Sequence, residues 1–101
     1  MPATSYAGVK GTGHGTYPPR DTDTEKMQVT DVFVNNKKIL VEGDPFKPHQ
    51  NTKKPYDVHP GSVSAGSGTV FAGNKAVARI GDPIDCGSAV AEGSPDVITG
   101  G

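Results

Sequence analysis

The feature that most constrains the fold is an internal repeat, because one short pattern occurs twice in the chain. Residues 32–46 read VFVNNKKILVEGDPF and residues 70–84 read VFAGNKAVARIGDPI, with seven of the fifteen positions identical. Each copy predicts a strand, a two-residue turn, a second strand and a Gly-Asp-Pro break. A repeat of this kind predicts copies of one small unit packed on one another.

Part of the pattern returns at the C-terminus. Residues 93–101 (GSPDVITGG) align with residues 66–74 (GSGTVFAGN), so the chain ends at the turn where a second strand should begin. The N-terminal residues 7–11 resemble residues 78–81 and can supply the missing strand. We therefore expect the last strand to pair with the first, which fixes both ends. The result would be a pseudo-threefold object made from one chain.

The short strands and missing helical patterns predict an all-β domain, and the composition predicts that its core alone is too poor to keep it folded. The 101 residues indicate a single domain, 1–101, yet only 33% are hydrophobic and none is Trp. A chain of this size buries roughly 60–65% of its unfolded surface, which leaves a poor core marginal. A single cysteine excludes an internal disulfide. The stabilising element must therefore be a metal, a partner, or both.

Charge and hydropathy exclude several classes of partner. Ten basic and eleven acidic residues give a net charge of −1, which argues against general nucleic-acid binding. No apolar run approaches the roughly 20 residues of a membrane span. The N-terminus, MPATSYAGVK, lacks the apolar stretch of a signal peptide. We expect the protein to be made in the cytoplasm and to need an apparatus for any export.

Helical periodicity is nearly absent, and residues 86–93 would form one helical turn at most. Asn35-Asn36 and Gly73-Asn74 stand where a two-residue hairpin turn needs positive φ. The prolines of both Gly-Asp-Pro breaks are expected to end the hairpins, because proline cannot donate to the ladder. The polar stretches 15–28 and 50–58 are expected to be long loops, the first of them mobile.

The candidate metal ligands are His14, His49, His59 and Cys86. Cys86 and His49 each follow a Gly-Asp-Pro break by a few residues, and His14 follows Gly11 at the corresponding exit. His59 lies on the arm that returns to the next hairpin. Three imidazoles and one thiolate suit tetrahedral Zn²⁺, and iron accepts the same ligands. We predict a closed structural zinc site, against the alternative of unrelated surface histidines and a buried thiol.

The repeat resembles the PAAR-repeat family. The resemblance rests on the Asn/Gly turn, the segment Ala-Arg-Ile-Gly-Asp at residues 78–82, the cysteine that follows it, and Gly-Ser-Pro at residues 93–95. It covers nearly the whole chain and is strongest over residues 66–101. Residues 40–44 keep only Gly-Asp of that segment, and residues 7–12 lack the Asp.

The resemblance implies a small cone of short β-hairpins with a metal near its vertex, held at the positions of the four candidate ligands. It further implies a non-catalytic tip that caps the trimeric, VgrG-like spike of a type VI secretion system or the central spike of a contractile phage tail. One tip would bind each trimer, effector proteins would be separate chains, and a target membrane would be contacted only during injection. The tip would be delivered outward on contraction or belong to the virion. The hairpin ends expected to dock on the spike are Asn35, Asn36, Gly73, Asn74, Gly100 and Gly101.

Other function classes remain as alternatives. If His59 were not a ligand, His14, His49 and Cys86 would leave the open position of a small zinc hydrolase. Such an enzyme needs a general base, and no glutamate of this chain stands in a motif that places it beside the ligands. A metal carrier that never meets a spike would release its ion without unfolding. Cys86 as a nucleophile lacks a surrounding catalytic signature. We therefore predict that the chain is not an enzyme.

Overall fold

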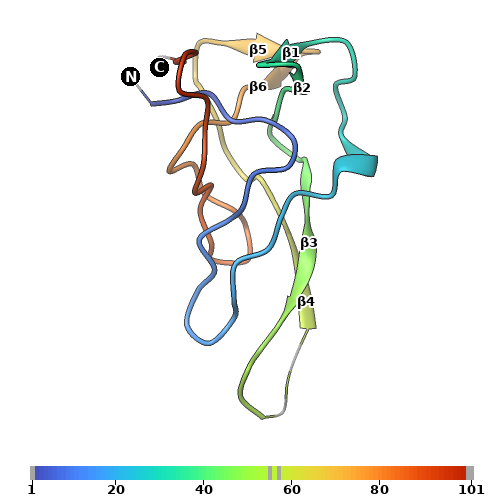
Figure 1. Cartoon of the computed structure of the whole chain (residues 1–101), viewed down its shortest axis with the longest axis vertical. Helices are drawn as coiled ribbons and strands as arrows, with labels where there is room; N and C mark the ends of the chain where they lie inside the picture. Colours follow the sequence, from blue (N-terminus) through green and yellow to red (C-terminus); the bar gives the residue numbers. More distant parts are fainter. Residues whose placement is uncertain (1, 55, 57, 100–101) are drawn as a thin grey trace.

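The computed structural model describes residues 2–54, 56 and 58–99. This part of the chain is built from short antiparallel strands and contains a 3-10 turn, η1 (Thr24–Lys26), but no α-helix. The molecule measures 40 × 26 × 21 Å. Short hairpins and both chain ends lie at one end of the long axis, and one longer hairpin reaches the other (Figure 1). The predicted all-β class is confirmed.

The repeated segments form the short hairpins that the sequence predicts. Their turns have positive φ at both central residues, 50° and 66° at Asn35 and Asn36, and 55° and 64° at Gly73 and Asn74. This is the geometry of a type I′ turn, whose twist matches that of the strands. The strands are β1 (Phe33–Val34) paired with β2 (Lys37–Lys38), and β5 (Phe71–Ala72) paired with β6 (Lys75–Ala76).

The chain ends form the third copy. Ala3 pairs antiparallel with Ile98, and the amide of Thr4 donates to the carbonyl of Val97 at 2.9 Å. The same bond joins Val77 to Val70 at 3.1 Å and Ile39 to Val32 at 2.9 Å in the other copies. The expected pairing of the last strand with the first is therefore present.

Backbone hydrogen bonds close a ring around a pseudo-threefold axis. The amide of Ser5 donates to Ala78 at 2.9 Å, that of Ala78 to Leu40 at 2.8 Å, and that of Leu40 back to Ser5 at 3.3 Å. All three residues are fully buried. Because each copy donates to the next, no strand edge at this level is left unpaired.

In the third copy, the glycine of the turn that follows the hairpin is Gly8. The sequence alignment had predicted Gly11. Gly8, Gly43 and Gly81 have φ of 101°, 92° and 88°, a conformation that disfavours side chains. Gly11 lies three residues further along, where it pairs with Val90. Similarity over five residues placed the third copy out of register.

Aspartates brace two of these turns. The buried Asp44 carboxylate accepts the amides of Val41 at 2.8 Å and Gln28 at 2.9 Å. Asp82 accepts the amide of Arg79 at 2.7 Å and pairs with its guanidinium at 3.0 Å. This explains the Gly-Asp signature: glycine allows the turn, and the carboxylate satisfies its amides.

The hairpin of β1 and β2 ends before the Gly-Asp-Pro break at residues 43–45, yet a further strand that the sequence did not predict begins at Pro45. That residue opens strand β3 (Pro45–Gln50), which pairs with β4 (Val58–Ser62) as the long hairpin. The segment 15–28, expected to be mobile, is packed instead: Thr22 is buried and bonded to Val9, and Met27 belongs to the core. Within the part of the chain described, no helix is long and apolar enough to cross a membrane.

Candidate metal centre

The four candidate ligands come from arms that extend beyond the glycine turns. The arms begin at the antiparallel pairs Lys10–Asp21, Pro45–Ser62 and Pro83–Ala89. They differ in length, so the threefold repeat breaks down at this end. His14 lies in the first arm, His49 and His59 face each other in β3 and β4 of the second, and Cys86 lies in the turn of the third.

Backbone bonds show which ligands occupy equivalent positions. The amides of Thr12, Lys47 and Asp85 make matching bonds, to Ala89 at 2.8 Å, Asp21 at 2.8 Å and Ser62 at 2.9 Å. Two residues further along each arm stand His14, His49 and Gly87. The predicted equivalence therefore holds for His14 and His49, whereas Cys86 lies one residue short of the equivalent position.

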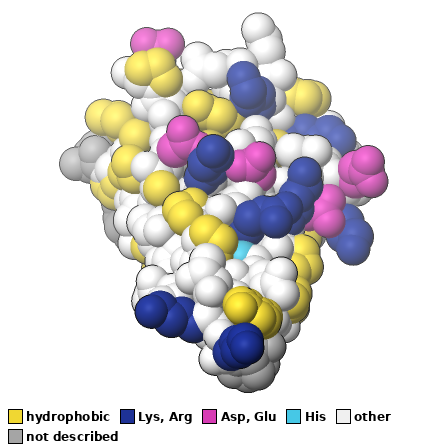
Figure 2. Space-filling model, turned by 60° about the horizontal axis from the view of Figure 1, so that its bottom comes forward, with side chains coloured by type: hydrophobic (Ala, Val, Ile, Leu, Met, Phe, Trp, Pro, Cys, Tyr) yellow, Lys and Arg dark blue, Asp and Glu magenta, His cyan; other side chains and the backbone are white. Residues whose placement is uncertain are grey.

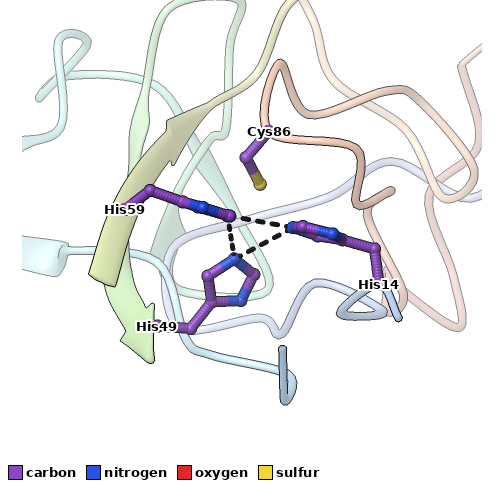
Figure 3. A group of neighbouring side chains, drawn as sticks. All are labelled: His14, His49, His59 and Cys86. Atoms are coloured by element: carbon purple, nitrogen blue, oxygen red, sulfur yellow. Dashed lines mark hydrogen bonds between the residues drawn. The ribbon is translucent and has the colours of Figure 1, made fainter. Parts of the chain in front are cut away.

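The side chains converge on one point (Figure 3). The ligand atoms of His14, His49, His59 and Cys86 all lie within 4.8 Å of one another. The His14 Nε2 atom is 3.2 Å from Nε2 of His49 and 2.9 Å from Nε2 of His59, and the last two are 2.6 Å apart. The structure thus brings together every candidate ligand that the sequence singled out.

The donor set fits a tetrahedral ion. His49 Nδ1 lies 2.8 Å from the carbonyl of Pro18, and because a carbonyl only accepts, Nδ1 carries the proton and Nε2 keeps a free lone pair. Tetrahedral Zn²⁺ with Zn–N of about 2.05 Å separates its nitrogen ligands by about 3.3 Å. The observed separations reach that value after small outward shifts. Three Nε2 atoms and a sulfur directed at one point can hold a metal ion.

Burial favours the neutral, metal-binding form of His14. Desolvation, followed by the charges of His49 and His59, lowers the pKa of His14 below its ordinary value of 6.5. His49 is buried, and His14 and His59 are half-buried. Figure 2, which brings the narrow end forward, shows only a small patch of histidine on that face. The centre is therefore largely covered.

The neighbours of the ligands leave little room around them. A Cβ atom on Gly61 would lie 2.8 Å from the sulfur of Cys86, so the β4 backbone closes directly on the thiol. One on Gly87 would lie 3.5 Å from the ring of His14. Sequence reasoning missed these contacts and those of Tyr17 and Pro18; the signal available was an aromatic residue and two prolines just after His14.

The residues expected to dock on a spike lie at the opposite end. Asn35, Asn36, Gly73 and Asn74 form the turns of the short hairpins there (Figure 1), while Gly100 and Gly101 are outside the described residues. The side-chain amide nitrogen of Asn35 donates to the carboxylate of Asp96 at 3.3 Å, and its side-chain oxygen accepts from the hydroxyl of Ser94. Its polar groups are therefore satisfied within the chain.

Exposed apolar side chains flank these turns, a feature that the sequence prediction missed. Phe33, Phe71 and Ile98 are 57%, 58% and 59% exposed and stand at equivalent positions of the three copies. Val32, Val70 and Val97 precede them and are also exposed. We call these residues the apolar ring. An apolar surface that repeats with the threefold axis is typical of an interaction site.

Comparison with known families gives a match over the second half of the chain. The model of the PAAR motif matches residues 53–101, which include His59 and Cys86 and all of β4 to β6. No curated protein matches the sequence. His14 and His49 lie before the matched segment, and the repeat and the ligand geometry relate them to it.

Proposed function

Because this chain is a PAAR-repeat protein, we propose that it is the non-catalytic, zinc-stabilised tip of a contractile injection machine. The whole chain, residues 1–101, would act as one domain that caps a trimeric β-helical spike, VgrG-like or that of a phage tail. It would sharpen the spike for piercing a target cell envelope. Members of the family sit on spike proteins, and this chain has a broad end and a narrow end suited to that arrangement.

The observation that carries the docking proposal is the apolar ring. A trimeric spike ends in three equivalent edges, and a single-chain cap can meet all three only if its own surface repeats three times. Phe33, Phe71 and Ile98 provide such a repeat at the broad end. We assign to the same proposed surface the turn residues Asn35, Asn36, Gly73 and Asn74, together with the sequence-predicted Gly100 and Gly101, which lie outside the described residues.

The proposed role of the metal is structural. His14, His49, His59 and Cys86 would hold Zn²⁺, or iron in its place, and the ion would supply coordinate bonds between three arms at a point too narrow for an apolar core. Metal binding can contribute on the order of 10 kcal/mol to the folding of such a domain. That is comparable with the whole net stability of a typical domain, about 5–15 kcal/mol.

The geometry supports a closed site over the alternative of a zinc hydrolase. A hydrolase needs an open coordination position, and the proximity of His59 Nε2 to both other histidine nitrogens argues that this position is filled. We propose further that the protein is made in the cytoplasm and delivered outward with the spike.

A direct test measures metal content and binding stoichiometry together. The purified chain should carry one zinc per molecule, and one chain should bind each spike trimer in analytical ultracentrifugation. Three chains per trimer would refute the asymmetric cap. A metal-free protein with an unchanged melting temperature would refute the structural role of the ion.

A further inference from the structure

Tyr17 contacts the candidate metal centre without contributing a ligand atom to it. Its ring centroid lies 4.2 Å from that of His59, 4.8 Å from that of His14 and 5.0 Å from that of His49. The interplanar angles are between 26° and 37°. One aromatic side chain thus covers part of all three imidazoles.

The backbone holds Tyr17 in this position. His14 and Tyr17 exchange both backbone hydrogen bonds, at 3.1 Å and 2.8 Å, so a tight turn places the tyrosine directly beside the ligand. Gly13 is needed for this turn, since a Cβ there would lie 2.6 Å from the carbonyl of Tyr17. The following residue, Pro18, restricts the backbone of Tyr17 to extended conformations.

The same segment is fastened on its other side. The Thr16 carbonyl accepts both the amide and the hydroxyl of Thr52, each at 3.0 Å, and the Thr16 hydroxyl bonds to Asn51. The carbonyl of Pro18 accepts from Nδ1 of His49. Residues 13–18, which we call the strap, therefore connect the first arm to the long hairpin. The strap places the side chain of Tyr17 against the three histidines.

We infer that Tyr17 is a lid that slows metal exchange at this centre by shielding the histidine nitrogens from water and competing chelators. The inference rests on the proposed metal site but concerns its kinetics. Gly61 and Gly87 also lie against the ligands, and their backbone cannot move aside without opening an arm. A side chain can rotate away, so Tyr17 controls access. Because the ring faces the imidazoles, the lid depends on the flat ring and not on the hydroxyl.

The test compares zinc release to excess EDTA from the loaded wild-type protein and its variants. Tyr17→Phe should release zinc at the wild-type rate, Tyr17→Ala at least about tenfold faster, and Tyr17→Leu at an intermediate rate. The matched control is Tyr56→Ala, which removes a tyrosine that is 47% exposed in the loop between β3 and β4. Amide exchange at Val41 and Val77 separates a lid from general destabilisation, because a lid leaves these core amides unchanged.

Several results would overturn the inference. Release from Tyr17→Leu within twofold of wild type would do so even if the alanine variant did not fold, as would faster release that accompanies faster exchange of the core amides. If the wild-type protein binds zinc and the Tyr17 variants release it at the wild-type rate, the lid is refuted but the proposed function is not. If wild type takes up no zinc, the proposed ion fails, and diethyl pyrocarbonate on the metal-free protein decides the lid. Histidine modification no faster in Tyr17→Leu than in wild type would then refute it.

Discussion

The apolar ring makes a quantitative prediction about spike binding. Phe33 and Phe71 are 57% and 58% exposed. Fully burying a Phe side chain contributes about 1.5–3 kcal/mol, so docking that covers its exposed half should add roughly 1–1.5 kcal/mol to the binding free energy for each phenylalanine. Replacing both by alanine should therefore weaken binding by about 2–3 kcal/mol, or roughly 30- to 150-fold in Kd.

Isothermal titration of a trimeric β-helical spike with the wild-type and double-variant chains measures this loss. Since both rings are largely in water, the double variant should melt within a few degrees of wild type, which separates docking from folding. Tyr56→Ala is the matched control, because it removes an aromatic ring of similar exposure at the narrow end. The reasoning fails if the double variant keeps its affinity within about threefold, or if Tyr56→Ala weakens binding equally.

Other predictions concern folding. His14→Ala should lower the melting temperature of the zinc-loaded protein sharply and make it insensitive to EDTA; a wild-type curve unchanged by EDTA would contradict this. The pKa of His14 in the folded state is lowered below 6.5. The unfolded state therefore binds more protons just below that pH, and the metal-free wild-type protein should lose stability as the pH falls through about 6.5. Calorimetry at several pH values measures this loss. Gly81→Val, at φ 88°, should cost more than about 1 kcal/mol and Lys53→Val much less, compared by urea unfolding. Asp44→Ala should cost about 3 kcal/mol by the same method, through the two amides it leaves unpaired, whereas the exposed Asp31→Ala should be near neutral.

The hairpins were predictable because local chemistry determines them. The Asn35-Asn36 and Gly73-Asn74 turns need positive φ, and few residue types tolerate it, so the sequence states the geometry directly. The third copy was predictable only in outline. Its Gly8 has no aspartate after it, and without that marker the alignment chose Gly11. The aspartate that stabilises each of the other two turns is therefore also the residue by which the turn can be recognised in the sequence.

The long hairpin β3–β4 was not predictable, because its signals conflict. Pro45, Pro48 and Pro60 all argue against a ladder. Pro45, however, is the first residue of β3, and Pro48 and Pro60 lie where the register shifts, between the pairs Phe46–Gly61 and His49–His59. Strand starts and irregular pairing are positions where proline is tolerated. The four ligands, in contrast, were found by residue type and by their place after each turn. Their convergence depends on the arms, whose different lengths a single sequence does not reveal. Tyr17 was missed for the same reason, since its role exists only once the strap is folded.

The position of the ligands follows from where the backbone pairing stops. From the ring of Ser5, Leu40 and Ala78 toward the narrow end, each copy bonds to the next in matching steps. The last such step is made by the amides of Thr12, Lys47 and Asp85. His14 and His49 follow two residues later, and Cys86 one residue later. Beyond the last step, the described residues share no backbone bond that repeats in all three arms, and the amide of Thr52 joins only the first arm and the long hairpin, through the carbonyl of Thr16. The histidines and the cysteine lie just beyond this final shared hydrogen bond, so a metal ion bound by them would join all three arms where the repeated backbone bonds end.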